Sequence, residues 1–257
     1  MRLLKLSAHC GAFVNTRQSF LELQHSDRDT MKKEFELLTA AMEYVPKWGF
    51  TQKAVAMACS DGKASLGFNG NLIGALYKDN VEHELAWTHL RNCRERLASK
   101  ELLDRLDAAR YTDAFGNERQ TTEMDRAKWL VKERLLMNAP IRGRLTELMA
   151  ILVQPACWGK SLEELHQLSD DVAFYAGDRS TDFAWYSKRM AFSAVYLQCE
   201  AFMSKDTSQD FVNTLAFVDA RLDEVDKLGS AYNDVEEWGI FNAWSVVNLV
   251  RSQIVKG

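Results

Sequence analysis

The chain is poor in the residues that interrupt helices. Its 257 residues include only 3 prolines and 13 glycines, while 47% of the residues are apolar. So few breakers disfavour a turn-rich β fold and predict a mostly helical protein with a sizeable buried core. The five cysteines (Cys10, Cys59, Cys93, Cys157 and Cys199) are odd in number and form no C-x-x-C pair. This spacing argues against both a disulfide framework and a zinc site.

Long apolar runs and an excess of basic charge are missing as well. The 13 uncharged residues from Trp238 to Val250 fall short of the roughly 20 that a membrane-spanning helix needs. The net charge of −4 argues against a protein that binds nucleic acid through its phosphate backbone.

The first 20 residues contain no acidic side chain, but they include Arg2, Lys5 and Arg17 among leucines and hydroxyl residues. This composition is typical of a mitochondrial presequence, with an ordinary N-terminus as the alternative. We expect residues 21–29 to form a linker that leads into the folded part.

Residues 30–80 follow the pattern of a helix-turn-helix. A helix is expected up to Tyr44, a second from Thr51 to Cys59, and a third within residues 64–76. The pattern from Ala41 to Ala56, with Gly49-Phe50-Thr51 at its centre, resembles the N-terminal module of TetR-type repressors. However, residues 64–76 carry no charge, whereas a recognition helix needs Lys or Arg for phosphate contacts. We therefore predict a helical module without DNA contact and keep a TetR-type ligand-responsive regulator as the alternative.

Residues 81–229 are predicted to be a helical core. The expected helices cover 81–110, 122–138 and 141–153, followed by one that begins at a Ser161-x-x-Glu164 capping box and ends at Gly177. Residues 111–120 are expected to form a loop. Arg134, Arg142 and Arg144 are interpreted as a solvated basic face rather than as contacts to lipid headgroups.

The helix expected from Phe183 to Met203 has two apolar stripes. One contains Phe183, Tyr186 and Met190, and the opposite one contains Trp185, Phe192, Tyr196 and Cys199 with Arg189 beside it. A cation next to an apolar wall suits a phospholipid, with the cation for the phosphate and the wall for the acyl chain. The residues Arg189, Phe192, Tyr196 and Cys199 are therefore our predicted lipid contacts. The alternative is a helix central to the core, which explains all of them except Arg189. Asp170 and Asp171, at the end of the preceding helix, oppose its dipole and are predicted to contact a partner, with solvated acidic side chains as the alternative.

Residues 230–257 are predicted to form an amphipathic helix. Its apolar face includes Ile240, Trp244, Val247, Val250 and Ile254, with polar residues opposite. Such a helix suits the interface of a membrane, and packing back onto the domain is the equal alternative.

Catalytic patterns are sparse. The two Glu-x-x-His pairs, Glu22/His25 and Glu163/His166, are reminiscent of a di-iron bundle, but the first lies outside any expected bundle helix. No zinc spacing or nucleophile motif is present. The residues therefore predict an all-α binding protein without catalytic or metal-binding residues, with a di-iron oxidase as a third alternative.

One stretch resembles a known family. The pattern Asp170-Asp171-x-x-x-Tyr175-Ala176-Gly177-Asp178-x-Ser180-Thr181-Asp182-Phe183-x-Trp185-Tyr186-x-Lys188-Arg189 is similar to the signature of the ubiquinone-biosynthesis accessory proteins of mitochondria. Further matches are Arg134-Leu135-x-Met137-x-x-Pro140-Ile141 and the ending Val247-Asn248-Leu249-Val250-x-Ser252-Gln253, which indicates a fungal-type member.

The resemblance implies a TetR-like helical bundle that binds phospholipid and isoprenoid lipid and needs no cofactor. It also implies a peripheral protein on the matrix side of the inner mitochondrial membrane, in contact with other members of the ubiquinone-biosynthesis complex. There it would present quinone precursors to the di-iron demethoxyubiquinone hydroxylase; a homodimer is left open. Carried over by position, the partner contacts are Asp170, Asp171, Asp182, Trp185 and Tyr186, and Arg189 is the headgroup contact. Val172, Ala173 and Phe174 depart from the side chains of animal relatives.

Overall fold

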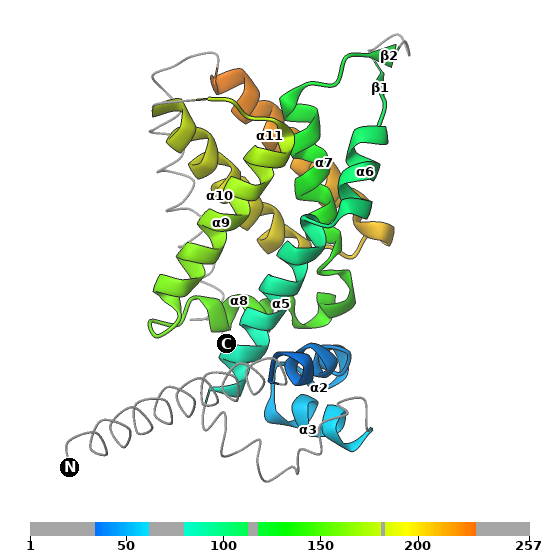
Figure 1. Cartoon of the computed structure of the whole chain (residues 1–257), viewed down its shortest axis with the longest axis vertical. Helices are drawn as coiled ribbons and strands as arrows, with labels where there is room; N and C mark the ends of the chain where they lie inside the picture. Colours follow the sequence, from blue (N-terminus) through cyan, green and yellow to red (C-terminus); the bar gives the residue numbers. More distant parts are fainter. Residues whose placement is uncertain (1–33, 62–79, 113–117, 181–182, 230–257) are drawn as a thin grey trace, which may run out of the picture.

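The computed structural model describes residues 34–61, 80–112, 118–180 and 183–229 (Figure 1). These residues form an all-α fold, as predicted. After a helix over 34–41, the elements are α2 (Val45–Trp48), α3 (Gln52–Ser60), α5 (Val81–Leu97), α6 (Lys100–Ala108), β1 (Tyr111–Thr112), β2 (Glu118–Arg119), α7 (Glu123–Leu136), η1 (Ala139–Arg144), α8 (Leu145–Leu152), α9 (Trp158–Ala176), α10 (Phe183–Met203), η2 (Gln209–Phe211) and α11 (Val212–Gly229).

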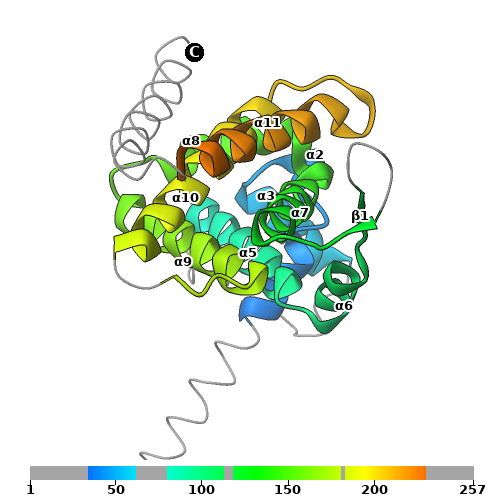
Figure 2. The same ribbon diagram turned by 90° about the horizontal axis from the view of Figure 1, so that it is seen from above.

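Helix α7 lies at the centre of the bundle. It packs against α5, α6, α9, α10 and α11, and the view from above shows these helices arranged around it (Figure 2). Leu130 and Leu135 on α7 are completely buried, as is Leu85 on α5. Each such side chain contributes about 1.5–3 kcal/mol of hydrophobic stabilisation. Within the described part of the chain, no helix is both long enough and apolar enough to cross a bilayer.

The N-terminal helices, up to α3, sit below the bundle at the foot of α5 (Figure 1). Pro46 lies in the first turn of α2, where its missing N–H is tolerated, so this proline starts a short helix. Gly49 then takes φ +72°, and Glu147 of α8 accepts the backbone N–H of Phe50 at 2.9 Å. Residues 62–79, which hold the third expected helix, are outside the described ranges.

The prediction of a single helix over 81–110 is wrong. The chain turns at Ala98, and Ser99 becomes the N-cap of α6 by accepting a hydrogen bond from the N–H of Leu102. The expected loop at 111–120 contains a short antiparallel pair, β1 and β2, in which Tyr111 faces Arg119.

The predicted capping box at Ser161 and Glu164 is also wrong. Helix α9 begins earlier, at Trp158, and the Ser161 hydroxyl instead donates to the carbonyl of Leu152 at 2.7 Å. The other end of the helix is confirmed, because Gly177 adopts a left-handed conformation with φ +94° and ends α9 there. The predicted helix from Phe183 to Met203 is confirmed as α10.

Candidate functional site

A buried carboxylate holds the turn between α9 and α10. The side chain of Asp178 is fully buried and accepts the backbone N–H and the hydroxyl of Ser180, at 3.0 and 2.8 Å. Lys188 Nζ donates to it at 2.9 Å and Arg189 Nη1 at 3.0 Å. Burial alone raises the pKa of Asp178, but the hydrogen bonds from Lys188, Ser180 and Arg189 outweigh it and hold that pKa well below its usual range. The charged carboxylate therefore ties the start of α10 to the turn.

Arg189 makes a second set of contacts in the same place. Its Nε donates to Asp170 Oδ1 at 2.6 Å, and its Nη1 donates to the carbonyl of Trp185 at 3.1 Å. The guanidinium carbon lies 3.8 Å from the centre of the Trp185 ring. Only 7% of the Arg189 side chain is exposed. The structure thus brings Arg189, the predicted headgroup contact, against Asp170 and Trp185, which were predicted to contact a partner protein. Contact of Arg189 with a lipid stays a prediction.

The two aromatic residues at the start of α10 differ in exposure. Trp185 is half-buried, whereas Tyr186 is 63% exposed and packs edge-on against Trp185, with ring centres 4.7 Å apart. The sequence placed Tyr186 both on an apolar stripe and among the partner contacts, and the structure puts it at the surface. Phe174 (71%) and Met190 (49%) are large apolar side chains that are also exposed on these two helices. Asp182 lies outside the described residues.

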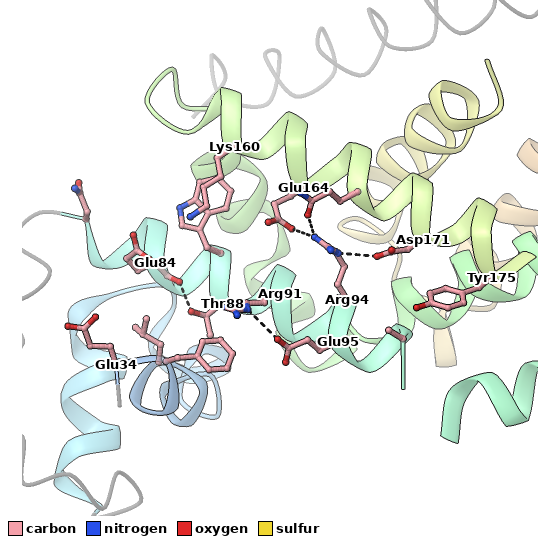
Figure 3. A pocket seen from close by; sticks show the side chains of 16 residues that line it. Glu34, Glu84, Thr88, Arg91, Arg94, Glu95, Lys160, Glu164, Asp171 and Tyr175 are labelled. Atoms are coloured by element: carbon pink, nitrogen blue, oxygen red, sulfur yellow. Dashed lines mark hydrogen bonds and ion pairs between the residues drawn. The ribbon is translucent and has the colours of Figure 1, made fainter. Parts of the chain in front are cut away.

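The predicted pair Asp170 and Asp171 points in two directions. Asp170 contacts Arg189 on α10, whereas Asp171 faces α5, where Arg94 Nε donates to it at 3.0 Å. Arg94 also donates to Glu164 at 3.0 Å and contacts Gln167 (Figure 3). Burial raises the pKa of Asp171, although Arg94 opposes the change. Asp170 therefore links α9 to α10, whereas Asp171 links α9 to α5.

A groove of about 880 Å³ runs beside Arg94, between α5, α9 and the helix over 34–41. Figure 3 shows charged side chains of both signs along it. Arg94 is shared by two carboxylates, and Arg91 pairs with Glu95. Lys160 lies over the Trp87 ring, at 4.5 Å. Most of these cations already have partners, so the groove has no concentrated charge of one sign.

The predicted lipid contacts Phe192, Tyr196 and Cys199 lie on the inner face of α10. All three are buried in the core. A cavity of about 10 Å³ borders Phe192 and Tyr196, which is about the space of one water molecule. In this conformation the core beside these residues is packed closed.

A cluster of buried polar side chains was missed by the sequence patterns. Arg134 Nη1 donates to Asn138 Oδ1 at 3.0 Å, and Asn138 Nδ2 donates to Glu200 Oε1 at 2.9 Å. The Tyr196 hydroxyl also donates to that Glu200 oxygen, at 2.8 Å, and His89 Nε2 lies 2.8 Å from Asn138 Oδ1. Arg134 is only 1% exposed, so its interpretation as part of a solvated basic face is wrong.

Cys93 borders the same cluster. Its sulfur lies 3.6 Å from His89 Nε2, one helical turn away on α5. Burial raises the pKa of the Cys93 thiol, but the nearby Arg134 and His89 outweigh burial and lower the pKa to about 7. The His-x-x-x-Cys spacing was the one signal of this contact in the sequence.

The remaining predictions concern the membrane and metals. The membrane contacts Ile240, Trp244, Val247, Val250 and Ile254 lie outside the described residues. Among the residues that are described, no group of three or more His, Cys, Asp or Glu side chains is arranged to hold a metal ion.

Comparison with known proteins identifies clear relatives. A family model described as COQ9 matches residues 158–229, which include α9, α10 and α11. The chain is 33% identical over 228 residues to "Ubiquinone biosynthesis protein COQ9, mitochondrial" of Eremothecium gossypii, covering 87% of each chain. It is 34% identical to the corresponding protein of Schizosaccharomyces pombe, covering 86% of this chain and 81% of the relative. It is 32% identical to the human protein, covering 80% of this chain and 61% of the relative.

Proposed function

Because this chain belongs to the COQ9 family of ubiquinone biosynthesis proteins, we propose that it is a mitochondrial, non-catalytic accessory protein that binds lipid. In this role it presents quinone precursors to the di-iron demethoxyubiquinone hydroxylase while attached to the matrix face of the inner membrane. The mitochondrial location of the named relatives supports the compartment. Neither the relatives nor the described residues support the alternative of a DNA-binding regulator.

The exposed aromatic surface at the start of α10 is the observation that carries this proposal. Tyr186 is 63% exposed and rests on the half-buried Trp185. Large aromatic side chains on a supported surface are the usual anchors of protein interfaces, because they bury much apolar area at little entropic cost. We define Trp185, Tyr186, Phe174 and Met190 as the partner surface.

The partner surface is tested by truncating one anchor. Tyr186→Ala is expected to weaken binding of the purified hydroxylase by about tenfold, because an interface anchor is lost. Trp158→Ala is the control, since Trp158 is also exposed, at 54%, at the opposite end of α9. Isothermal titration with both variants measures the difference. Equal affinities for the two variants would refute the partner surface, and a lower unfolding temperature for Tyr186→Ala alone would show that Tyr186 is structural.

Lipid binding is the second part of the proposal. Phe192, Tyr196 and Cys199 supply an apolar wall, but the cavity of about 10 Å³ beside Phe192 and Tyr196 is too small for an acyl chain. Lipid binding at these residues therefore requires the helices packed around them to move apart. Native mass spectrometry of protein purified from membranes is expected to show bound phospholipid or isoprenoid lipid. Protein that is consistently empty, even after incubation with lipid, would contradict this part.

The membrane contacts are tested in the full chain. Val247→Asp places a charge on the predicted apolar face of residues 230–257, whereas Asn248→Asp adds the same charge to the polar face. Co-sedimentation with vesicles of phosphatidylcholine and cardiolipin is expected to fail for the first variant and to persist for the second. Equal binding of both variants would favour a segment that does not insert its apolar face.

A further inference from the structure

The partner surface rests on a chain of contacts that begins in the turn after α9. Tyr186 packs on Trp185, and Trp185 is flanked by His166, with ring centres 6.2 Å apart, and by the guanidinium of Arg189. Arg189 is in turn fixed by Asp170 and Asp178. The orientation of the exposed aromatic pair therefore depends on a cation that is itself almost completely buried.

The shape of the guanidinium matters in this arrangement. Its Nε edge meets Asp170, its Nη1 meets both Asp178 and the Trp185 carbonyl, and its flat face lies on the indole. A planar group with several fixed donors satisfies these contacts together, whereas the single ammonium of lysine does not. The charge of Arg189 is balanced by two carboxylates, so a lipid phosphate at this cation would compete with Asp170 and Asp178.

From this geometry we infer that Arg189 is a positioning residue of the partner surface: it holds Trp185, and through Trp185 it holds Tyr186, in the orientation that a partner protein meets. The inference rests on the partner surface proposed above and gives Arg189 a role different from that of a headgroup contact. Asp178 contributes to the same positioning. Its carboxylate accepts hydrogen bonds from Arg189 and Lys188 and from the backbone N–H of Ser180 in the turn.

Arg94 provides a matched control for Arg189. It is also a largely buried arginine that pairs with two carboxylates of α9, Glu164 and Asp171. Its contacts lie on the α5 side of that helix (Figure 3). Arg94→Gln therefore removes a similar set of ion pairs without removing the support beneath Trp185.

The first measurement compares two binding reactions. Arg189→Gln and Arg189→Lys are both expected to weaken hydroxylase binding by about tenfold, while binding to vesicles of phosphatidylcholine and cardiolipin changes less than about twofold. Arg94→Gln is expected to leave both unchanged. Loss of vesicle binding with normal hydroxylase binding in Arg189→Gln would instead make Arg189 a headgroup contact. Wild-type hydroxylase affinity in Arg189→Lys would show that a positive charge alone supports the partner surface, and would overturn the role of the guanidinium shape.

A double-mutant cycle separates positioning from a general loss of stability. In a Trp185→Ala background, Arg189→Gln is expected to cost no further hydroxylase affinity, because the side chain through which it acts is gone. Additive losses in the double variant would overturn the inference.

A measurement without the partner keeps the two proposals distinguishable. The indole N–H NMR signal of Trp185, identified by its loss in Trp185→Phe, is expected to shift in Arg189→Gln and Arg189→Lys but not in Arg94→Gln. If the wild-type protein binds no hydroxylase yet this signal shifts, the partner proposal fails and the positioning of Trp185 stands. An unchanged signal in both Arg189 variants overturns the positioning role itself.

Discussion

Two buried arginines show two ways in which this molecule holds a cation away from water. Arg189 is matched by the carboxylates of Asp170 and Asp178. Arg134 has one direct acceptor, Asn138, and the ring of Tyr196 beside it at 5.3 Å, while the carboxylate of Glu200 is reached through Asn138. Its Nε has no hydrogen-bond partner in the described structure. Removing one partner from such a cluster is costly, because it leaves a buried charge uncompensated.

Arg134→Met is expected to destabilise the protein by about 3 kcal/mol or more, because Glu200 is left buried without a nearby cation. Urea denaturation measures the loss. Adding Glu200→Gln to that variant is expected to recover part of it, since the buried charge is then removed. A double variant as unstable as the sum of the two single changes would show that the charges of Arg134 and Glu200 are not coupled.

Asp125 gives a prediction about pH. It accepts two hydrogen bonds from Arg119 and one each from the N–H and hydroxyl of Thr122. Burial raises the pKa of Asp125, but these contacts outweigh burial and lower the pKa to about 2. A carboxyl with a depressed pKa adds stability above its unfolded value of about 3.9 and loses it as the pH falls toward 2.

Asp125→Asn is therefore expected to lower the free energy of unfolding at pH 7 by about 1–2 kcal/mol after solvent screening. Between pH 4 and about 2 the wild type should lose this advantage, so the two proteins converge. Thermal unfolding of both proteins between pH 7 and pH 2 measures whether the difference in stability shrinks. A constant difference between the two proteins at every pH would show that the carboxylate charge is not the cause.

At the scale of elements, the sequence predicted where helices exist better than where they begin. The apolar spacing of α10 and the glycine that ends α9 were sufficient, because both signals are local. The break at Ser99 was missed, since the surrounding charged residues continue a helical pattern on both sides. The capping box predicted at Ser161 was wrong although its local pattern was present. Helix α9 begins at Trp158, and the Ser161 hydroxyl donates to the carbonyl of Leu152 at the end of α8, a contact that the local pattern does not reveal.

The break between α5 and α6 is itself testable. Ser99→Ala removes the side-chain oxygen that accepts the N–H of Leu102 and is expected to cost about 1 kcal/mol. Ser60→Ala is the control, because the exposed Ser60 hydroxyl donates to the carbonyl of Ala56 within its own helix, α3. Chemical denaturation of the two variants gives the comparison. An equal cost in both would mean that Ser99 does not act as a cap.

The part of the candidate site around the α9–α10 turn could also be predicted, because its signals are local. The residues of the α9–α10 turn are close in sequence, so a continuous signature identified Asp170, Trp185, Tyr186 and Arg189 together. The pairing of Asp171 with Arg94 and of Glu200 with Asn138 joins residues more than sixty positions apart. Such contacts are set by how helices pack, and helical periodicity carries no information about them.

At the scale of the whole molecule, the partner surface and the N-terminal module lie at opposite ends. The turn between α9 and α10 is at the top of Figure 1, while α2 and α3 lie at the bottom. At one seam between the module and the core, Glu147 accepts the N–H of Phe50 and Arg144 donates to the carbonyl of Lys47 at 3.1 Å. The first helix meets the core elsewhere, where the guanidinium of Arg91 on α5 lies over the Phe35 ring. Because the seam at Glu147 and the turn after α9 lie at opposite ends of the molecule, the two are expected to respond independently.

Gly49→Ala tests this independence. A Cβ at position 49 would lie 2.8 Å from both carboxylate oxygens of Glu147, and φ +72° with ψ −174° is a conformation that only glycine adopts readily. The substitution is expected to cost about 1–3 kcal/mol and to speed hydrogen exchange across α2 and α3. Gly143→Ala, with open space around its Cβ, should change neither the stability nor the hydrogen exchange.

Hydroxylase binding and the Trp185 signal are expected to remain normal in both variants, since the partner surface is held by Arg189 and Asp178 at the far end. Weakened binding in Gly49→Ala alone would show instead that the seam is coupled to the partner surface through the bundle.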